Sequence, residues 1–220
     1  MNPISMLSSP KGAKEQMTEA TAEASLDLLF EPYDLGPAKL RNRVAMAPMT
    51  RKRSPGGIPD DEVVAYYRRR AEGGIGLLFS EGTCIDHPSA QAHEGTAYQN
   101  IPHFFGEAAL AGWAKVVAAV QEAGAAFMPQ LWHVGEVRRL GMPADPGVPG
   151  YGPREIAEDG RVLVKAMEED DIEAVAASYA RGAATARELG CDGVALHGAH
   201  GYLMDQFFWP GTNRRGDAYG

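Results

Sequence analysis

This chain has few cysteines, no long apolar run and no excess of basic residues. Two cysteines, Cys84 and Cys191, occur in 220 residues, which is too few for a disulfide scaffold and favours a reducing, cytoplasmic setting. No stretch approaches the ~18 apolar residues of a membrane-spanning helix, so we expect no membrane partner. The formal net charge of −8 argues against nucleic acid as a partner, because a phosphate-binding surface needs a basic excess.

An apolar pattern is missing from the start of the chain as well. Residues 1–25 are polar and lack the continuous apolar segment of a secretory signal. We therefore interpret residues 1–27 as a disordered leader and residues 28–220 as a single domain. Hydrophobic residues make up 45% of the chain, which is enough to bury one sizeable core.

Four apolar segments alternate with segments in which apolar residues have helical spacing. Helices are predicted through residues 63–71, 105–120 and 172–189, the last with Asp170 or Asp171 as its N-cap. The predicted strands flank these helices, at residues 44–47, 75–80, 127–131 and 194–196. Alternation of this kind predicts an α/β fold with parallel strands.

Two features interrupt this alternation. Pro129 lies inside the third predicted strand, where its missing N–H would break the ladder of hydrogen bonds, so we expect a bulge at the end of that strand. Residues 134–167 are rich in glycine and proline and form a longer connection than is typical. We interpret them as a lid or rim loop.

The segment GCDGVALHGAHGYLMDQFFW, at residues 190–209, holds the densest group of chemically active side chains. His197, His200 and Tyr202 follow directly after the fourth predicted strand. In a barrel of parallel strands and helices, active sites are built at the carboxyl ends of the strands. The two glycines between these side chains allow a tight turn and the close approach of a flat ligand.

Other strand ends supply polar or unobstructed positions. Thr50 follows the first predicted strand and offers a hydroxyl that both donates and accepts. Gly82 follows the second strand and has no side chain to obstruct a flat ring, and Gln130 offers an amide near the end of the third. Each position also has an ordinary structural explanation, such as a polar strand terminus. Their recurrence at successive strand ends is what favours a site.

Several motifs together resemble the flavin-dependent ene-reductases of the Old Yellow Enzyme type. They are APMTR at 47–51, QLWH at 130–133, HGAHGY at 197–202 and NRRGDAYG at 213–220. The resemblance implies a TIM (β/α)8 barrel, an FMN cofactor and NADH or NADPH as reductant. Such a barrel has eight strands and ~250 residues. We therefore expect the chain to hold the first four β/α units, as a fragment or truncated gene product with two open strand edges.

The resemblance also implies roles for individual residues. His197 and His200 would hold the carbonyl or nitro oxygen of a small-molecule substrate, with Trp132 lining the same pocket. Tyr202 would give a proton to the α-carbon while hydride reaches the β-carbon from flavin N5. Enones, maleimides and nitro compounds are the expected substrates. The implied FMN contacts are Ala47, Pro48, Met49, Thr50, Gly82 and Gln130.

Three alternatives stay open at this point. His133, His197 and His200 could together form a metal site, although the first strand end offers no further histidine or carboxylate. The chain could belong to a TIM-barrel lyase or aldolase that uses a phosphorylated substrate, although no strand ends on a lysine for Schiff-base chemistry. It could also be a non-catalytic half-barrel that binds a partner. A homo-oligomer is compatible with each alternative.

Overall fold

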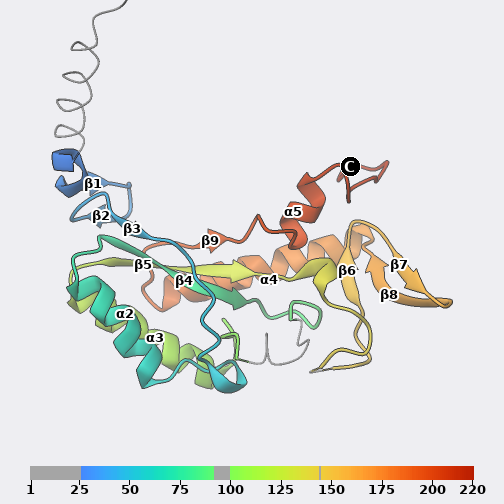
Figure 1. The fold of residues 1–220 in the computed structure, drawn as a ribbon, viewed down its shortest axis with the longest axis horizontal. Coiled ribbons are helices and arrows are strands. Elements are labelled where there is room, and N and C mark those ends of the chain that lie inside the picture. The colour runs from blue at the N-terminus through green and yellow to red at the C-terminus, as the bar shows by residue number, and fades with distance from the viewer. Residues whose placement is uncertain (1–25, 92–99, 144) are drawn as a thin grey trace, which may run out of the picture.

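The computed structural model describes residues 26–91, 100–143 and 145–220. Its centre is a curled parallel sheet, shown in Figure 1, with the strand order β3–β4–β5–β9. These strands match the four predicted segments, although β3 and β9 at the two edges have only two residues each. Their bounds are Ala45–Met46, Leu77–Cys84, Ala126–Trp132 and Ala195–Leu196.

The predicted leader falls largely outside the described residues. Residues 1–25 are not described, and residues 26–30 are helical and exposed. The proposed boundary of the leader at residue 27 therefore stays a prediction.

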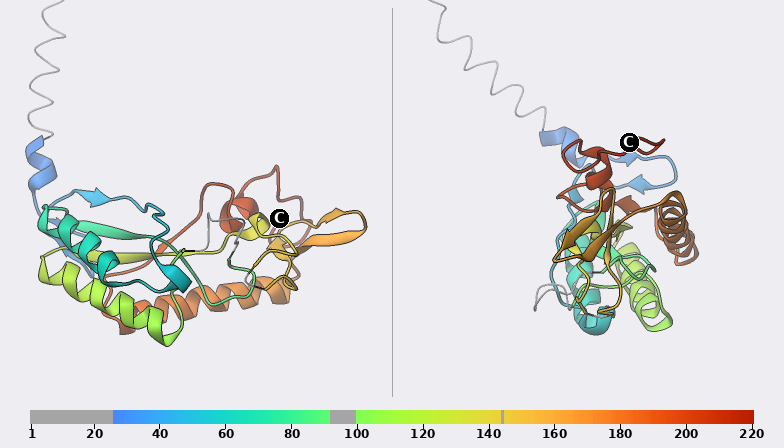
Figure 2. Two further views of the ribbon diagram at one scale, coloured as in Figure 1. Left: turned by 60° about the horizontal axis from the view of Figure 1, so that its bottom comes forward. Right: turned by 90° about the vertical axis from the view of Figure 1, so that its right-hand side faces the viewer.

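Three long helices lie along one side of the sheet, as both views in Figure 2 show. In the first of them, Val63, Tyr67 and Ala71 are buried and lie four residues apart, so they form one face toward the sheet. No helix in the described part of the chain is long and apolar enough to cross a membrane. The helices are α2 (Asp61–Glu72), α3 (Glu107–Glu122) and α4 (Glu169–Glu188).

Carboxylates begin two of these helices. The Asp60 carboxylate accepts the backbone N–H groups of Glu62 and Val63 at 3.0 and 3.1 Å and so caps α2. The N-cap of α4 is Glu168, so the prediction of Asp170 or Asp171 is wrong. Asp171 is already inside the helix, and its carboxylate accepts the N–H of Glu168 at 2.8 Å in a capping box.

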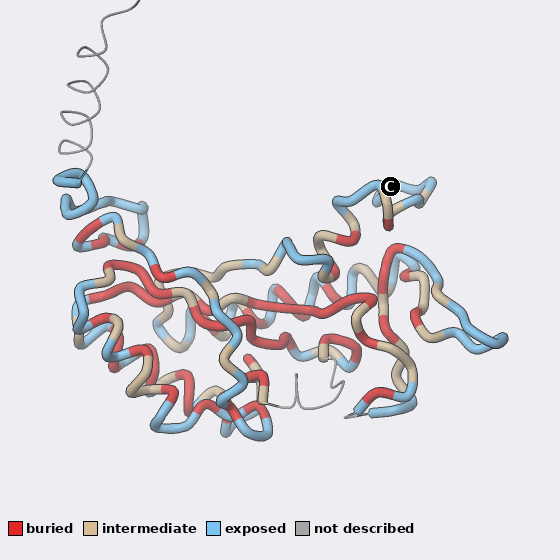
Figure 3. The backbone as a smooth tube through the Cα atoms, viewed as in Figure 1, coloured by how far each residue is buried: buried red, intermediate tan, exposed pale blue. Residues whose placement is uncertain are grey.

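The main core lies between the sheet and the helices. Figure 3 shows buried backbone along β4 and β5 and along the helix faces that meet them. Tyr67, Trp113 and Phe127 form its aromatic centre, with ring centroids 5.5 to 6.3 Å apart. All three side chains are essentially inaccessible to solvent. This packing fixes the sheet as the rigid frame of the molecule.

A hairpin covers the amino ends of the central strands. It consists of β1 (Tyr33–Asp34) and β2 (Lys39–Leu40), which pair antiparallel. Leu40 and its neighbour Ala38 pack against Leu77 and Ala126, the first residues of β4 and β5. The amino ends are therefore closed, and the carboxyl ends of the strands are left to form a site.

The pairing of β4 with β5 is irregular at Pro129. Two residues of β4, Ser80 and Glu81, lie opposite this single proline. The predicted bulge is therefore present, but in the neighbouring strand. Because Pro129 has no N–H, the next donor along the chain, the N–H of Gln130, bonds to the Ser80 hydroxyl at 2.8 Å.

Within residues 134–167, where the sequence predicted a lid or rim loop, the described residues include a small sheet. A 3-10 turn, η3 (Gly135–Val137), leads into three strands in the order β6–β8–β7. The glycines and prolines that suggested a loop lie around and between short strands. The small sheet stands beyond the carboxyl ends of β4 and β5 in Figure 1. Its strands are β6 (Gly150–Gly152), β7 (Ile156–Glu158) and β8 (Arg161–Ala166).

The Ser80 hydroxyl provides a test of the bulge. It accepts from Gln130 and also donates to the carbonyl of Glu81 at 2.6 Å. We expect Ser80→Ala to lower the free energy of unfolding by ~1–3 kcal/mol, because it leaves a buried N–H unsatisfied. Urea denaturation measures this loss.

The matched control is Ser178→Ala, another buried serine, whose hydroxyl donates to the carbonyl of Ala174 within α4 at 3.0 Å and accepts from the exposed Arg181 guanidinium at 2.7 Å, which water can replace. That carbonyl keeps its helical bond, so the control should cost less than Ser80→Ala. Equal losses would contradict the role given to Ser80.

Candidate active site

One hollow of about 640 Å³ lies at the carboxyl ends of β3, β5 and β9. It gathers most of the residues that the sequence predicted for a site. Met49 and Gly82 are the predicted residues that do not line it, and Met49 is half exposed beside it. The lining residues are Ala47, Pro48, Thr50, Gln130, Trp132, Leu196, His197, Gly198, Ala199, His200 and Tyr202.

Gly82 contributes by making room for Trp132. The second strand runs on to Cys84, so Gly82 lies within β4, opposite Gln130, and not after the strand as predicted. A Cβ at position 82 would lie 2.8 Å from the Trp132 ring. The Trp132 ring therefore occupies the space that a side chain would need, and it is this ring that faces the hollow.

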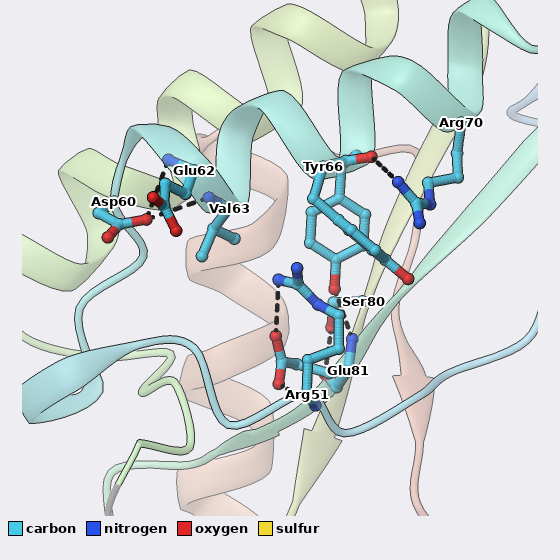
Figure 4. A network of polar contacts seen from close by, with 9 residues as sticks. Arg51, Asp60, Glu62, Val63, Tyr66, Arg70, Ser80 and Glu81 are labelled. Atoms are coloured by element: carbon cyan, nitrogen blue, oxygen red, sulfur yellow. Dashed lines mark hydrogen bonds and ion pairs between the residues drawn. The ribbon is translucent and has the colours of Figure 1, made fainter.

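A buried ion pair fixes the chain beside Thr50. The Glu81 carboxylate is inaccessible to solvent and lies 3.0 Å from the Arg51 guanidinium, as Figure 4 shows. The same carboxylate accepts the backbone N–H of Arg51 at 2.9 Å. Because Thr50 directly precedes Arg51, this double contact sets where Thr50 enters the hollow.

Two tyrosines of α2 contact the residues of this ion pair. The Arg51 guanidinium lies 3.7 Å from the ring centroid of Tyr66, a favourable cation–π geometry. The Tyr67 hydroxyl accepts the backbone N–H of Glu81 at 2.8 Å. Burial, together with the nearby Glu81 carboxylate, raises the pKa of Tyr67 above its ordinary value, so its phenol stays neutral.

Sequence reasoning missed this network. The available signal was an acidic residue inside the apolar run LLFSEG, because a buried carboxylate requires a partner. The partner, Arg51, lies 30 residues earlier in the chain, and no local pattern connects the two.

The turn after β9 brings two imidazoles and a phenol together. The His197 ring lies 5.7 Å from the His200 ring and 4.9 Å from the Tyr202 ring, measured between centroids. The Trp132 ring packs against both His197, at 5.7 Å, and Tyr202, at 4.7 Å. The predicted catalytic and substrate-binding side chains thus form a single aromatic cluster on one wall of the hollow.

The backbone of this turn restricts which residue can occupy position 200. His200 has a φ of 61°, followed by Gly201 with a φ of 72°. Among residues with a Cβ, asparagine, aspartate and histidine adopt this left-handed region most readily. The turn therefore accepts a polar donor at position 200 at a small conformational cost.

His197 is held as a neutral imidazole. Burial is the main cause that lowers its pKa, with a further contribution from the nearby His200, while the Asp205 carboxylate acts in the opposite direction. Its Nδ1 atom is buried and has no hydrogen-bond partner among the described residues. A buried polar atom without a partner, on the wall of a hollow, fits a ligand-binding group.

Gln130 and Thr50 supply the hollow with groups that suit a polar, flat ligand. The side-chain amide of Gln130 and the hydroxyl of Thr50 make no hydrogen bond to another described residue, and both line the hollow. An amide suits the imide edge of a flavin, since it offers both a donor and an acceptor. None of the residues lining the hollow is Lys or Arg, so they can hold the ring of FMN but not its phosphate by charge.

The alternative of a metal site finds no support in the described residues. They contain no group of three or more His, Cys, Asp or Glu placed to hold a metal ion. His133 is buried away from the other two histidines, where its Nε2 lies 3.0 Å from the Ser89 hydroxyl and its Nδ1 accepts the N–H of Gly135. Burial holds its pKa well below the ordinary value.

A second hollow, of about 600 Å³, lies beside α4 and the short helix α5 (Leu203–Phe208). Its lining includes apolar residues such as Ile172, Val175 and Phe207 and contains no His, Asp, Glu, Lys or Arg. It includes two phenols, Tyr179 and Tyr219, but no imidazole. The first hollow, with two imidazoles and a phenol, offers more groups for acid–base chemistry.

The parallel sheet, its covering helices and a site at the strand carboxyl ends define part of a (β/α)8-barrel enzyme of the flavin-binding type. Residues 28–220 match the family model described as NADH:flavin oxidoreductase / NADH oxidase family, and the chain belongs to that family.

Among its relatives, 12-oxophytodienoate reductase 1 of Oryza sativa subsp. japonica is 36% identical over 207 residues, which cover 92% of this chain and 52% of that protein. The flavin oxidoreductase hxnT of Emericella nidulans is 38% identical over 212 residues, or 89% of this chain and 52% of that protein. The chain spans about half the length of the curated relatives it matches.

Solved structures agree with this assignment. Morphinone reductase in complex with tetrahydroNAD superposes with a TM-score of 0.76 at 37% identity, over 87% of this chain and 55% of that one. Old Yellow Enzyme from Pichia sp. AKU4542 gives a TM-score of 0.78 at 31% identity, over 88% of this chain and 51% of that one. The predicted fold and the predicted family are confirmed.

The Arg51–Glu81 pair gives a stability prediction. We expect Arg51→Met to lower the free energy of unfolding by ~3–5 kcal/mol, because it leaves the Glu81 carboxylate buried without a partner. The double variant Arg51→Met/Glu81→Gln should recover part of the loss, since it removes the charge. Denaturant unfolding of the single and double variants measures the coupling.

The control is Arg68→Met, which breaks an exposed pair with Glu72 on α2 and should cost no more than ~0.5 kcal/mol. A loss at Arg51 as small as that at Arg68 would show that the buried pair does not hold this end of the sheet.

Proposed function

We propose that this chain forms the flavin-ring and substrate side of an FMN-dependent oxidoreductase that uses NADH or NADPH to reduce activated C=C bonds. The observation that carries the proposal is the single hollow in which Gln130, Thr50 and the unpartnered Nδ1 of His197 face the same space. Membership in the NADH:flavin oxidoreductase family supports it. Enones, maleimides and nitro compounds are the proposed substrates.

The residues of the first three strands would hold the cofactor ring. Gln130 would bond its imide edge, Thr50 would bond near its reactive edge, and Ala47, Pro48 and Met49 would supply backbone beside it. When bound, FMN supplies the hydride from its N5 atom. The phosphate of FMN needs positive groups, and the hollow has none among its described lining residues.

His197 and His200 would bind the carbonyl or nitro oxygen of the substrate. Because its pKa is lowered, His197 is a neutral imidazole at neutral pH, and one ring N–H remains to donate to that oxygen. Two such donors polarise the C=C bond and stabilise the negative charge that develops on the oxygen. Trp132 would limit the pocket from the β5 side.

Tyr202 would supply the proton to the α-carbon. A phenol keeps its proton at neutral pH, and a correctly placed phenol is an effective general acid. Edge contacts with the rings of Trp132 and His197 hold the Tyr202 ring in one orientation. Two of the rings that surround the substrate, those of Trp132 and His197, would therefore also orient the acid.

The first test is spectroscopic. The flavin-loaded protein should absorb in the visible and give a long-wavelength charge-transfer band when a para-substituted phenol binds as phenolate between the two histidines. We expect His197→Ala to weaken phenol binding by ~1.5–3 kcal/mol, the range for a hydrogen bond to a charged group.

The control is His200→Asn, which keeps a donor and suits the left-handed backbone, so it should weaken binding much less. Unchanged affinity in the double alanine variant would refute the role of the histidines.

The second test separates the two half-reactions. We expect Tyr202→Phe to leave the half-reaction with NAD(P)H nearly unchanged, because the ring and its packing remain. The half-reaction with a simple enone should slow by ~10²–10⁴-fold, as is typical of a lost general acid.

Stopped-flow absorbance at the flavin band measures both rates. Nitro substrates, which can leave as a stable nitronate, should be affected less than enones. Equal slowing of both half-reactions would instead indicate that Tyr202 serves only in packing.

A further inference from the structure

The side chain of Gln206 lies between the turn after β9, which carries the candidate catalytic groups, and the loop that follows β5. It belongs to α5 and is 3% exposed. Its Nε2 donates to the carbonyl of Gly201 at 2.5 Å, and its Oε1 accepts the backbone N–H of Glu136 at 3.0 Å. Gly201 lies in the turn after β9, and Glu136 lies in η3 after β5. One buried amide therefore joins both loops.

The partners of this amide fix its orientation. The Gly201 carbonyl can only accept a hydrogen bond, and the Glu136 N–H can only donate one. If the amide were rotated by about 180°, its oxygen would face the Gly201 carbonyl oxygen and its NH2 group would face the Glu136 N–H. Both contacts therefore depend on an amide in this orientation, and a carboxylate could keep only one of them.

Gly135 leaves space for the same amide. It has a φ of 62°, and a Cβ at this position would lie 2.2 Å from the Gln206 Oε1. Any other residue would displace the amide from its place between the loops. Gly135 and Gln206 thus fit each other, although they lie far apart in the sequence.

A second side chain of α5 holds the other backbone group of Gly201. The Asp205 carboxylate accepts the Gly201 N–H at 2.7 Å. Adjacent side chains of one short helix therefore bind both the N–H and the carbonyl of a residue that stands between His200 and Tyr202. Because the turn has two successive positive φ values, it depends on such outside contacts to stay in place.

We propose that Gln206 is a positioning residue, which holds His200 and Tyr202 at a fixed place relative to Trp132 at the end of β5. It does not line the hollow, so it acts only through the turn that it holds. The roles of the positioned groups rest on the proposed function above. The clamp between Gly201 and Glu136 is a property of the chain alone and can be tested alone.

The experiment compares Gln206→Glu, which is isosteric but loses the donor, with Gln206→Met, which loses both contacts. The control is Gln121→Met. The Gln121 amide donates to the carbonyl of Gly190 at 2.8 Å and to the Asp192 carboxylate at 3.2 Å, on elements that do not line the hollow. It therefore removes a similar amide contact elsewhere in the fold.

The first readouts use the protein without cofactor. Amide hydrogen exchange at Glu136 should be about 3–10-fold faster in Gln206→Met and close to wild type in Gln206→Glu, whose carboxylate still accepts that N–H. NMR titration should show the pKa of His197 rising in Gln206→Met, because a released turn lets His200 move away from it. Trp132, Tyr202 and Asp205, the other groups around His197, are unchanged in sequence.

The second readout uses the flavin-loaded protein. In both Gln206 variants we expect the alkene half-reaction to slow by about 10–100-fold, the effect of a small misplacement of reacting groups. The half-reaction with NAD(P)H and the affinity for FMN should stay as in wild type. Gln121→Met should change none of these quantities.

An unchanged His197 titration in Gln206→Met would overturn the proposal, as would, in either variant, a loss of FMN affinity equal to the loss of rate. If Gln206→Met does not fold, the two half-reaction rates and the FMN affinity of Gln206→Glu decide the question. A wild-type protein that reduces no alkene would contradict the proposed function, and the cofactor-free readouts would still decide whether the clamp exists.

Discussion

The buried Glu81 carboxylate is the constraint on which this end of the sheet depends. The bulge opposite Pro129 adds a residue to β4 and leaves Glu81 in the interior. A buried carboxylate must be paired and hydrogen-bonded, and Arg51 provides both its side chain and its backbone N–H. The chain after β3 therefore has to pass close to β4 before it turns into α2. Pro129 in β5 lacks an N–H, and the bulge opposite it lies in β4. Through Glu81 in that bulge, Pro129 influences the position of Thr50, which follows β3 on the other side of β4.

The other side of the hollow is held by different means. β9 has only two residues and pairs with β5 alone in the described part of the chain, so the sheet itself holds the turn after it only weakly. Side chains of α5 take over that task, through Asp205 and Gln206. Glu136, whose N–H meets Gln206, also binds the Arg154 guanidinium at 3.1 Å in a two-pronged contact. The small sheet that follows β5 is thereby connected to the same turn.

The sequence predicted the regular parts of the fold because burial leaves a local pattern. The apolar segments at β4 and β5 and the helical spacing in α2, α3 and α4 depend on neighbouring residues only. The prediction failed at the end of β4, where polar residues such as Glu81 sit inside a buried strand. It also failed at β6 to β8, where short strands among glycines and prolines carry no clear period.

The sequence predicted those parts of the candidate site that lie at the carboxyl ends of strands, because these ends meet at one edge of a parallel sheet. Thr50, Gln130, Trp132 and the residues of the turn after β9 do meet in one hollow. Gly82 does not line it, because the Trp132 ring packs directly against Gly82. No spacing in the sequence reveals this contact. Arg51, Glu81 and Gln206 were missed for the same reason, since each is explained by a partner far away in the sequence.

None of the groups that line the hollow is Lys, Arg, Asp or Glu, and this limits what the chain can do by itself. An amide, a hydroxyl, a neutral imidazole and a phenol can bind a ring, polarise a carbonyl and move a proton without placing a fixed charge beside the reacting carbon. They cannot bind a phosphate strongly, which requires Lys, Arg or a row of backbone N–H groups. The relatives are about twice the length covered by this chain. In a protein of that length, one part of the barrel can supply the positive groups that bind the cofactor phosphate, and another part the neutral donors that act on the substrate. The two sets of residues can then be altered separately.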